Sequence, residues 1–240
     1  RVGLANSVMS RLASCVTTSL PEHIGRLPKK TIYGFGTWVR KDILLGDISK
    51  GNTLFGASND DFCVLVLGGG TGAQAINAAV CAALPALSGL SLRMIHLTGA
   101  GRGGDECVLK GFSYPWYKPS VFLGSDLRHS LARADMVIGR AGFATIAEAA
   151  ALAKPLILIP KAGHQEDNVS YLESRRGILS IKETLLTDGA LLRAIEKMRG
   201  DGGFRFDIVL TLYKIVPKAE DDKTIDLLFD CIGKKRFVSG

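Results

Sequence analysis

Two glycine-rich stretches have the residue types and position to bind a charged ligand, because each lies between an apolar run and a helix-like segment. The first is Gly68-Gly69-Gly70-Thr71-Gly72, and the second is Gly139-Arg140-Ala141-Gly142. Glycine lets backbone amides approach an anion, and a helix N-terminus favours negative charge because its first amides lack partners. Two such loops at one end of a sheet predict a diphosphate between them. The alternatives are tight turns and, for Arg140, an exposed surface position.

The first loop also matches the dinucleotide pattern G-x-G-x-x-A, which ends here at Ala73. That pattern needs an acidic residue at the end of the next strand, where this sequence has Leu97, Thr98 and Gly99. The Gly-Lys-Ser/Thr of a P-loop is missing as well. A phosphate ligand is therefore predicted, whereas NAD is disfavoured.

Glu148 is the only charged residue of the helix-like stretch 143–153. The rest of this stretch is small and apolar on every side, which predicts burial, and a buried carboxylate needs a partner. Glu148 follows Gly142 by six residues, so it lies about 9 Å along the helix at a rise of ~1.5 Å per residue. A diphosphate and the ribose hydroxyls of one nucleotide are separated by a similar distance. We expect a ribose contact, with a structural salt bridge as the alternative.

A polar cluster follows the apolar run that ends in Pro160. It contains His164, Gln165 and Asn168, and the last two share a face if a helix begins at about residue 165. Imidazole and amide groups offer both donors and acceptors, which suits the hydroxyls of a sugar. The alternative is a polar loop in which Asn168 or Asp167 caps a helix.

These candidates need a scaffold of alternating strands and helices. The chain has apolar runs at 62–67, 92–97, 120–123, 136–138, 156–159 and 178–181. Helical patterns fall between or after them at 73–84, 126–134, 143–153 and 188–199. Strands that are apolar throughout, with helices between them, predict an α/β fold with a doubly wound, Rossmann-like parallel sheet. Ligands of such sheets bind at the carboxyl ends of the strands.

The remaining segments are shorter or more polar. We expect a helix at 5–14 and strands at 15–19 and 31–34, a linker in the polar stretch 41–61, and two amphipathic segments at 204–214 and 219–232.

Composition excludes several classes of protein. The chain is 47% hydrophobic and 22% charged, as in ordinary globular domains, and no run reaches the roughly 18 uncharged apolar residues of a membrane helix. The formal charge is +7, but the Lys and Arg residues are scattered and have no interleaved aromatics, which disfavours binding of nucleic acid.

The cysteines lie far apart in mostly apolar runs. This pattern predicts buried thiols in a reducing compartment rather than a metal site for Cys15, Cys63, Cys81, Cys107 and Cys231. The chain opens on Arg1, and we expect a fragment or a processed chain.

Several spaced motifs together resemble family 28 glycosyltransferases, and within them the MurG-type enzymes of peptidoglycan assembly. The motifs are Gly-Gly-x-x-Gly-Ala at 68–73, His-x-Thr-Gly at 96–99, Phe-Leu with Asp-Leu at 122–127, Ala-Asp-x-Val-Ile-x-Arg-Ala-Gly at 134–142, Thr-Ile-Ala-Glu-Ala at 145–149, Lys-Pro-x-Ile-Leu-Ile-Pro at 154–160 and His-Gln-x-x-Asn at 164–168. The resemblance implies the C-terminal half of a GT-B fold, in which two Rossmann-like domains face each other across a cleft.

The resemblance also implies a division of the chain. Residues 1–40 would be the remnant of an N-terminal acceptor domain with its interdomain linker, and 41–60 a linker or loop. Residues 61–203 would form the domain that binds the nucleotide-sugar donor, and 204–240 the C-terminal helices.

The site residues implied by the resemblance agree with the candidates above. Phe122 and the backbone of Leu123 would meet the uracil, Glu148 the ribose, and His164 with Gln165 the sugar, supported by Asn168. The diphosphate would be surrounded by Arg40 and both loops, whose implied members are Gly69, Gly70, Thr71, Gly72, Arg140, Ala141, Gly142, Phe143, Ala144 and Thr145. The sequence departs from the family at Gly70-Thr71, where Ser-Gln is usual, and at Thr37-Trp38, where Asn-Pro is usual.

The implied activity is inverting, metal-independent transfer of N-acetylglucosamine from UDP-N-acetylglucosamine to a lipid-pyrophosphate-linked sugar in peptidoglycan precursor synthesis. No cofactor is expected. The catalytic base would come from an N-terminal domain or partner subunit that this chain does not contain. The expected location is cytoplasmic, peripheral on the inner face of the plasma membrane. Three alternatives stay open: the donor subunit of a two-chain transferase acting on a dolichol-type lipid, a non-catalytic UDP-sugar binding module, and an NAD-dependent oxidoreductase.

Overall fold

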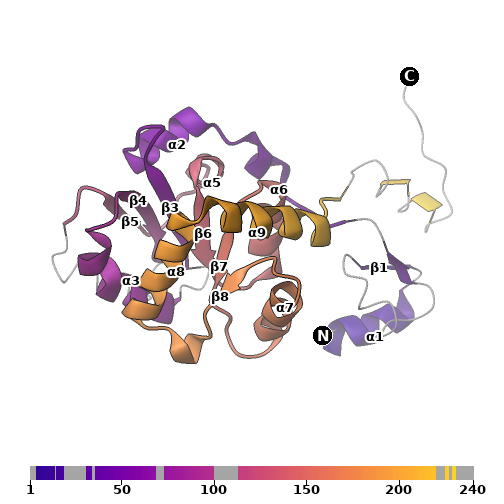
Figure 1. Cartoon of the computed structure of the whole chain (residues 1–240). Coiled ribbons are helices and arrows are strands. Elements are labelled where there is room, and N and C mark those ends of the chain that lie inside the picture. The colour runs from indigo at the N-terminus through magenta and orange to yellow at the C-terminus, as the bar shows by residue number, and fades with distance from the viewer. Residues whose placement is uncertain are drawn as a thin grey trace, which may run out of the picture.

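A parallel β-sheet organises the chain in the computed structural model, which describes residues 4–13, 15–18, 31–33, 36–68, 73–99, 113–219, 225–226 and 229–230. Its six strands lie in the order β5-β4-β3-β6-β7-β8 and every neighbouring pair is parallel (Figure 1). They are β3 (Phe62–Leu67), β4 (Leu92–Leu97), β5 (Tyr117–Ser120), β6 (Met136–Gly139), β7 (Leu156–Leu158) and β8 (Leu179–Ser180). The α/β, doubly wound fold expected from the sequence is confirmed.

The central strands are apolar on both faces because helices cover both. Val64 and Val66 of β3 pack into one hydrophobic cluster, whereas Cys63 and Leu65 pack into the other. The first cluster is closed by α3 (Gln74–Leu87) and α8 (Asp188–Gly200). The second is closed by η2 (Lys41–Leu45), α2 (Ile48–Phe55), α5 (Asp126–Arg133), α6 (Phe143–Ala151) and α7 (His164–Glu173).

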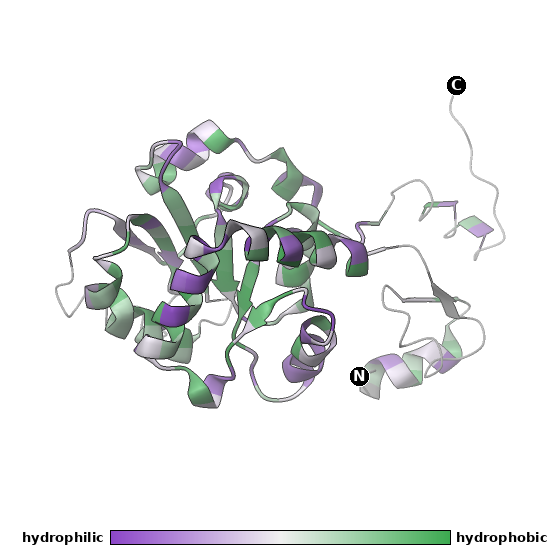
Figure 2. Cartoon of the chain, in the orientation of Figure 1, coloured by the Kyte–Doolittle hydropathy of each residue, from purple (hydrophilic) through white to green (hydrophobic). Residues whose placement is uncertain are grey.

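The helix α9 (Gly202–Ile215) joins the two layers, and its Arg205 lies over the ring of Phe62 at the start of β3. Its Ile208 belongs to the first cluster, whereas Leu212 belongs to the second. Figure 2 shows the same division by hydropathy, with apolar strands inside and polar residues on the outer helices. Continuous apolar strands between two amphipathic layers are typical of a sheet buried on both faces.

The stretch 41–60 is not the loop that we expected. It forms η2 and α2, and its Ile43 and Phe55 are each only 1% exposed. Gly46 lies so close to α5 that an added Cβ would come within 2.3 Å of the Arg128 carbonyl oxygen. The prediction of a loop was wrong because two buried anchors in a polar segment give no periodicity, although they suffice to pack it on α5. The domain boundaries stay a prediction.

The edge strand β5 lies three residues earlier than the apolar run 120–123 had indicated. The strand ends at Ser120, whereas Val121 and Phe122 lie beyond it and are 55% and 80% exposed. An edge strand is half solvated and tolerates proline, so a polar sequence containing Pro119 forms it. The hydropathy of residues 120–123 therefore predicted the wrong position for this strand.

Before the sheet, the described elements are α1 (Leu4–Leu12) and two short parallel strands, β1 (Val16–Thr18) and β2 (Thr31–Tyr33). These agree with the expected helix and strands. Downstream, Thr37 forms an isolated parallel bridge with Lys218, so two chain segments run side by side there. Gly36 has φ +72°, and a Cβ on it would meet the Lys218 backbone at 2.6 Å. The expected segment 219–232 lies mostly outside the described residues.

Two of the described cysteines differ from the expected buried thiol. Cys15 is only half-buried. Cys81 on α3 is disulfide-bonded. Cys63 is a buried thiol, and burial raises its pKa to about 12. Apolar surroundings predict burial for both cysteines but do not distinguish a thiol from a disulfide. Cys107 and Cys231 lie outside the described residues.

Candidate functional site

The candidate site lies where the chain reverses its direction of travel across the sheet. From β3 the chain continues outward through β4 to β5, and then returns to β6 on the other side of β3 before continuing to β7 and β8. β3 and β6 are therefore neighbours, with Leu67 beside Gly139 in register. The carboxyl ends of two parallel strands that diverge in this way form a topological switch point, where doubly wound sheets bind ligands.

The first glycine loop leaves β3 at this point. The Gly68 amide donates to the Leu97 carbonyl at 3.1 Å, and a Cβ on Gly68 would come within 2.8 Å of that oxygen. Only glycine allows this approach of the two strand ends. The loop then enters α3, whose N-cap Ala73 provides no side-chain cap. Gly69, Gly70, Thr71 and Gly72 lie outside the described residues.

The second loop leaves β6 and enters α6 directly. Its N-cap is Gly142, which likewise provides no side-chain cap, and Phe143, Ala144 and Thr145 form the first helical turn. A Cβ on Gly142 would meet nothing within 4 Å. Two helices thus begin at adjacent strand ends without side-chain caps. Helix N-termini of this kind attract anions through their amides and dipole.

Arg140 points away from the switch point. Its guanidinium donates to the Ile159 carbonyl at 3.2 Å and to Glu183 Oε1 at 2.6 Å, and its side chain is only 16% exposed. Glu183 belongs to the short helix η3 (Glu183–Leu185) after β8. Arg140 therefore ties together the ends of β6, β7 and β8. It is not the exposed surface residue that we named as an alternative.

Glu148 lies in the second turn of α6, and its side chain is 15% exposed. Its neighbours Ala147 and Ala149 are buried, as the apolar pattern of this helix predicted. Arg40 Nε donates to Glu148 Oε1 at 3.0 Å, and the arginine side chain is 57% exposed. The structure thus brings together two residues, 108 positions apart, that were singled out separately.

The polar cluster after β7 begins α7, one residue before the expected start. Gly163 is its N-cap with φ +103°, and Glu166 accepts from the Gly163 amide at 3.0 Å. Gln165 accepts from the Lys161 amide at 2.9 Å, and His164 is exposed. Asn168 donates to the Ala141 carbonyl at 3.0 Å, so it fixes α7 against the second glycine loop. The side chain that accepts from the N-cap amide is thus Glu166, which we did not name as a candidate.

Phe122 and Leu123 follow β5, at the edge of the sheet and on the same carboxyl side. Phe122 is 80% exposed, and Leu123 packs on the second hydrophobic cluster. The expected donor residues therefore fall into three groups. The second glycine loop and α7 lie at adjacent strand ends, Arg40 reaches α6 from the linker, and Phe122 lies farther along the edge of the sheet.

His96 carries a role that its motif did not reveal. It is fully buried, with Nδ1 2.9 Å from the Tyr117 hydroxyl and Nε2 3.0 Å from Asn77 Oδ1. Asn77 Nδ2 donates to the Thr98 carbonyl, so Oδ1 accepts and Nε2 carries the proton. Burial lowers the pKa of His96 to about 4. This neutral imidazole of β4 joins α3 and β5.

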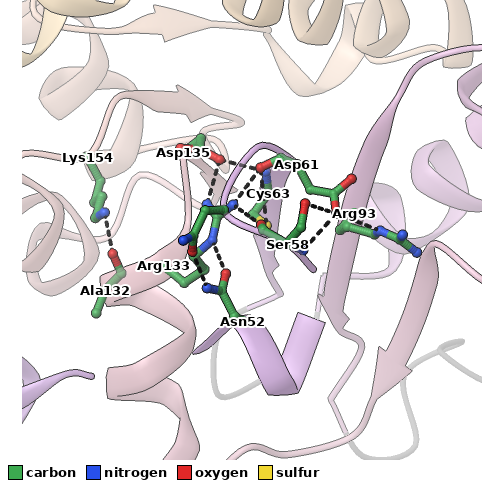
Figure 3. Close-up of polar contacts among 10 residues, drawn as sticks. Asn52, Ser58, Asp61, Cys63, Arg93, Ala132, Arg133, Asp135 and Lys154 are labelled. Carbon is green, nitrogen blue, oxygen red and sulfur yellow. Dashed lines mark hydrogen bonds and ion pairs between the residues drawn. The ribbon is translucent and has the colours of Figure 1, made fainter. Parts of the chain in front are cut away.

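A second polar cluster lies at the opposite end of the sheet (Figure 3). Arg133, 7% exposed, donates to Asp135 Oδ2 at 2.8 Å, to Asn52 Oδ1 at 2.5 Å, and to two backbone carbonyls. Asp135 also accepts from the Cys63 amide at 2.7 Å. Nearby, the ammonium of Lys154 donates to the Ala132 carbonyl at 2.7 Å, and burial lowers its pKa. Sequence reasoning missed this cluster, because its members are scattered from residue 52 to residue 154.

The described residues contain no group of three or more His, Cys, Asp or Glu side chains that could hold a metal ion. None of the described helices is both long enough and apolar enough to cross a membrane.

Strand order and loop position define the class of the protein, a Rossmann-like α/β domain whose two helix N-termini meet at the switch point. The model of the glycosyltransferase family 28 C-terminal domain matches residues 63–205. The chain therefore belongs to glycosyltransferase family 28.

Two curated relatives of this chain carry the same name. The UDP-N-acetylglucosamine--N-acetylmuramyl-(pentapeptide) pyrophosphoryl-undecaprenol N-acetylglucosamine transferase of Lachnoclostridium phytofermentans is 36% identical over 198 residues, which are 80% of this chain and 54% of that protein. The protein of the same name from Lachnospira eligens is 30% identical over 233 residues, 95% of this chain and 64% of the relative. The chain thus spans about half to two thirds of the length of these relatives.

Solved structures show the fold. The crystal structure of Acinetobacter baumannii MurG aligns with a TM-score of 0.72 at 20% identity, covering 95% of this chain and 63% of that one. The C-terminal CMP-Kdo binding domain of WaaA from the same organism aligns with a TM-score of 0.54 at 13% identity, covering 73% of this chain and 98% of that domain. The expected fold, the C-terminal half of the GT-B architecture, is confirmed.

Proposed function

We propose that this chain supplies the donor site of a glycosyltransferase that moves N-acetylglucosamine from UDP-N-acetylglucosamine to a lipid-pyrophosphate-linked sugar in peptidoglycan precursor synthesis. The observation that carries the proposal is that α3 and α6 both begin without a side-chain cap, just after the neighbouring strand ends of β3 and β6. The substrates are those in the names of two relatives, which are 36% and 30% identical to this chain.

In this proposal the diphosphate lies between residues 68–72 and 139–145. Glu148, about 9 Å from Gly142 along α6 at ~1.5 Å rise per residue, binds the ribose hydroxyls. His164 and Gln165 at the start of α7 bind the sugar, and Asn168 holds α7 against the second loop. Phe122 and Leu123 contact the uracil. Arg140 contributes by joining strand ends rather than by direct charge, because Glu183 already neutralises it.

The chemistry asked of these residues is stabilisation of the leaving group. An acceptor hydroxyl attacks the anomeric carbon with inversion, the bond from that carbon to the diphosphate oxygen breaks, and UDP leaves with the negative charge. Helix N-termini and the Arg40 guanidinium stabilise that charge, so the proposal needs no metal ion or cofactor. The base that takes the hydroxyl proton lies outside this chain, on an acceptor domain or partner subunit.

The acceptor named for the relatives is linked to undecaprenol, a membrane lipid. We therefore propose that the assembled enzyme works at the inner face of the plasma membrane as a peripheral protein. The net charge of +7 favours such a surface, because anionic lipids attract basic proteins.

A ligand panel tests the donor site. UDP-N-acetylglucosamine and UDP should each raise the midpoint of thermal unfolding, because a ligand that binds only the native state stabilises it. At a concentration 100 times the dissociation constant, the gain is about 2.7 kcal/mol. NAD should produce no shift. Stabilisation by NAD without stabilisation by UDP would exclude the transferase proposal.

A further inference from the structure

Two consecutive backbone carbonyls at the carboxyl end of β4 hold the chain on either side of the first glycine loop. The Leu97 carbonyl accepts from the Gly68 amide at 3.1 Å, just after β3 ends. The Thr98 carbonyl accepts from Asn77 Nδ2 at 2.9 Å, and Asn77 is the fourth residue of α3. The exit from β3 and the start of α3 are therefore both fixed to the same point of β4.

The side chain of Asn77 is buried, with only 1% of the residue exposed. Burying an amide is unfavourable unless its donors and acceptors find partners. The neighbouring buried residues of α3, such as Ile76 and Val80, are apolar. The Asn77 backbone amide donates to the Ala73 carbonyl at 2.9 Å, which closes the first turn of the helix. A force on the Asn77 side chain is thus transmitted directly to the start of α3.

His96 determines which way the Asn77 amide points. The proton on His96 Nε2 is donated to Asn77 Oδ1 at 3.0 Å, while Nδ1 accepts from the Tyr117 hydroxyl at 2.9 Å. A reversed Asn77 amide would place its Nδ2 against the Nε2 proton and its Oδ1 against the Thr98 carbonyl. Both new contacts would be repulsive, since each pairs two donors or two acceptors. The imidazole therefore keeps Nδ2 directed at Thr98.

We propose that Asn77 is a positioning residue for the diphosphate: it sets the N-terminus of α3 against the end of β4, and His96 orients its amide. This inference rests on the proposed function, which places the diphosphate beside that N-terminus. The amides of a helix N-terminus stabilise an anion only within the first turn, so a displaced α3 binds the diphosphate less well.

The first test measures the UDP dissociation constant of wild type, Asn77→Leu and Asn77→Asp by calorimetry. Leucine removes both hydrogen bonds of the amide. Aspartate has nearly the same shape and keeps the acceptor for His96, but its carboxylate has no donor for the Thr98 carbonyl. UDP affinity should fall by roughly 3- to 10-fold in each variant, because a helix N-terminus contributes about that much to binding an anion.

Tyr117→Phe is the matched control within the same buried network. It leaves His96 Nδ1 without its donor and should lower the midpoint of thermal unfolding. The hydrogen bonds from His96 to Asn77 and from Asn77 to Thr98 do not involve this hydroxyl. UDP affinity should therefore equal that of wild type, which separates positioning of α3 from general stability.

NMR spectra at saturating UDP locate the effect on one helix. In wild type, UDP should shift the backbone amide signals of Gln74 and Ala75 at the start of α3, and those of Ala144 and Thr145 at the start of α6. In Asn77→Leu or Asn77→Asp, the shifts on α3 should shrink while those on α6 persist. Equal shrinkage on both helices would overturn the positioning role.

The outcomes also separate this inference from the proposed function. If wild type binds UDP and both Asn77 variants bind it equally well, Asn77 serves only the fold and the donor site stands. If Tyr117→Phe loses as much UDP affinity as the Asn77 variants, affinity follows the stability of the network and the inference fails. If wild type does not bind UDP, the proposed donor site is wrong and the inference falls with it.

Discussion

The two ends of the β-sheet hold polar side chains under different conditions. At the amino end, Arg133 is buried and donates to two side chains and two backbone carbonyls, while Asp135 accepts from both Arg133 and the Cys63 amide (Figure 3). Its hydrogen-bonding groups are occupied by the protein itself. Such a network stabilises the fold and leaves little capacity for a ligand.

At the carboxyl end the polar groups retain capacity. Two helices begin there without side-chain caps, and Glu148 has one partner among the described residues, the exposed Arg40. Charge and burial alone therefore do not identify a binding site. A ligand can bind polar groups whose hydrogen-bonding capacity the protein does not fill. Here such groups lie at strand ends, where the loops carry few side chains.

The largest expected effect on stability is at the amino end. Arg133→Met should lower the free energy of unfolding by about 3 kcal/mol, because it leaves Asp135 and several acceptors without their partner. Urea unfolding measures this. Exposed Arg193→Met should change stability by less than about 0.5 kcal/mol. UDP affinity of folded Arg133→Met should equal that of wild type, and a weaker UDP complex would contradict the structural role assigned to this end.

The second prediction concerns acid stability and His96. Its pKa is about 4 in the folded chain and 6.5 when unperturbed, so between these values the unfolded chain binds the additional proton. The stabilisation is complete above pH 6.5 and is lost as the pH falls through about 4. Its full size is about 3 kcal/mol at 1.36 kcal/mol per pKa unit. Unfolding free energies measured from pH 7.5 to pH 4 should show this loss.

His96→Gln is the control for that measurement, because glutamine does not titrate but keeps a donor and an acceptor. The variant should be less stable at neutral pH and less sensitive to acid than wild type. Parallel pH profiles for the two proteins would show that His96 is not the group responsible. Carboxylates contribute equally to both profiles, so the difference between them isolates the imidazole.

The smallest effect on stability is expected at Glu148. Glu148→Gln should change the free energy of unfolding by less than about 1 kcal/mol, because it removes only a half-exposed ion pair. UDP affinity should nevertheless fall by roughly 10-fold, since a hydrogen bond to a charged group is lost. Calorimetry measures the affinity, with exposed Glu196→Gln on α8 as the control. An unchanged UDP affinity would contradict the ribose assignment and remove the contrast between the two ends.

The core strands and the glycine loop after β6 were predictable from the sequence because their signals are local. Apolar runs such as 62–67 are strands wherever both faces are covered, and glycines directly after a strand and before a helix mark a loop at the strand end. The edge of the sheet was not predictable in this way. The strand at 117–120 is polar because it is half solvated, and the apolar residues 121–122 lie outside it.

The segment 41–60 and the partners of the arginines were decided by contacts over long distances in the sequence. Arg140 was assigned to the diphosphate because it stands inside a glycine loop, yet its side chain lies against Glu183, 43 residues away. Glu148 was expected to have a partner, but nothing in the sequence named Arg40. Spacing along the chain reports the face of a helix or strand and carries no information on which distant element packs against it.

Hydrophobic periodicity and the conformational freedom of glycine therefore suffice to predict the central strands, the helices between them and the loop after β6. Only the tertiary structure decided that β3 and β6 are neighbours in register, and that the linker arginine reaches the carboxylate on α6. The physical reason is that strand pairing and ion pairing between distant segments depend on how the whole chain packs.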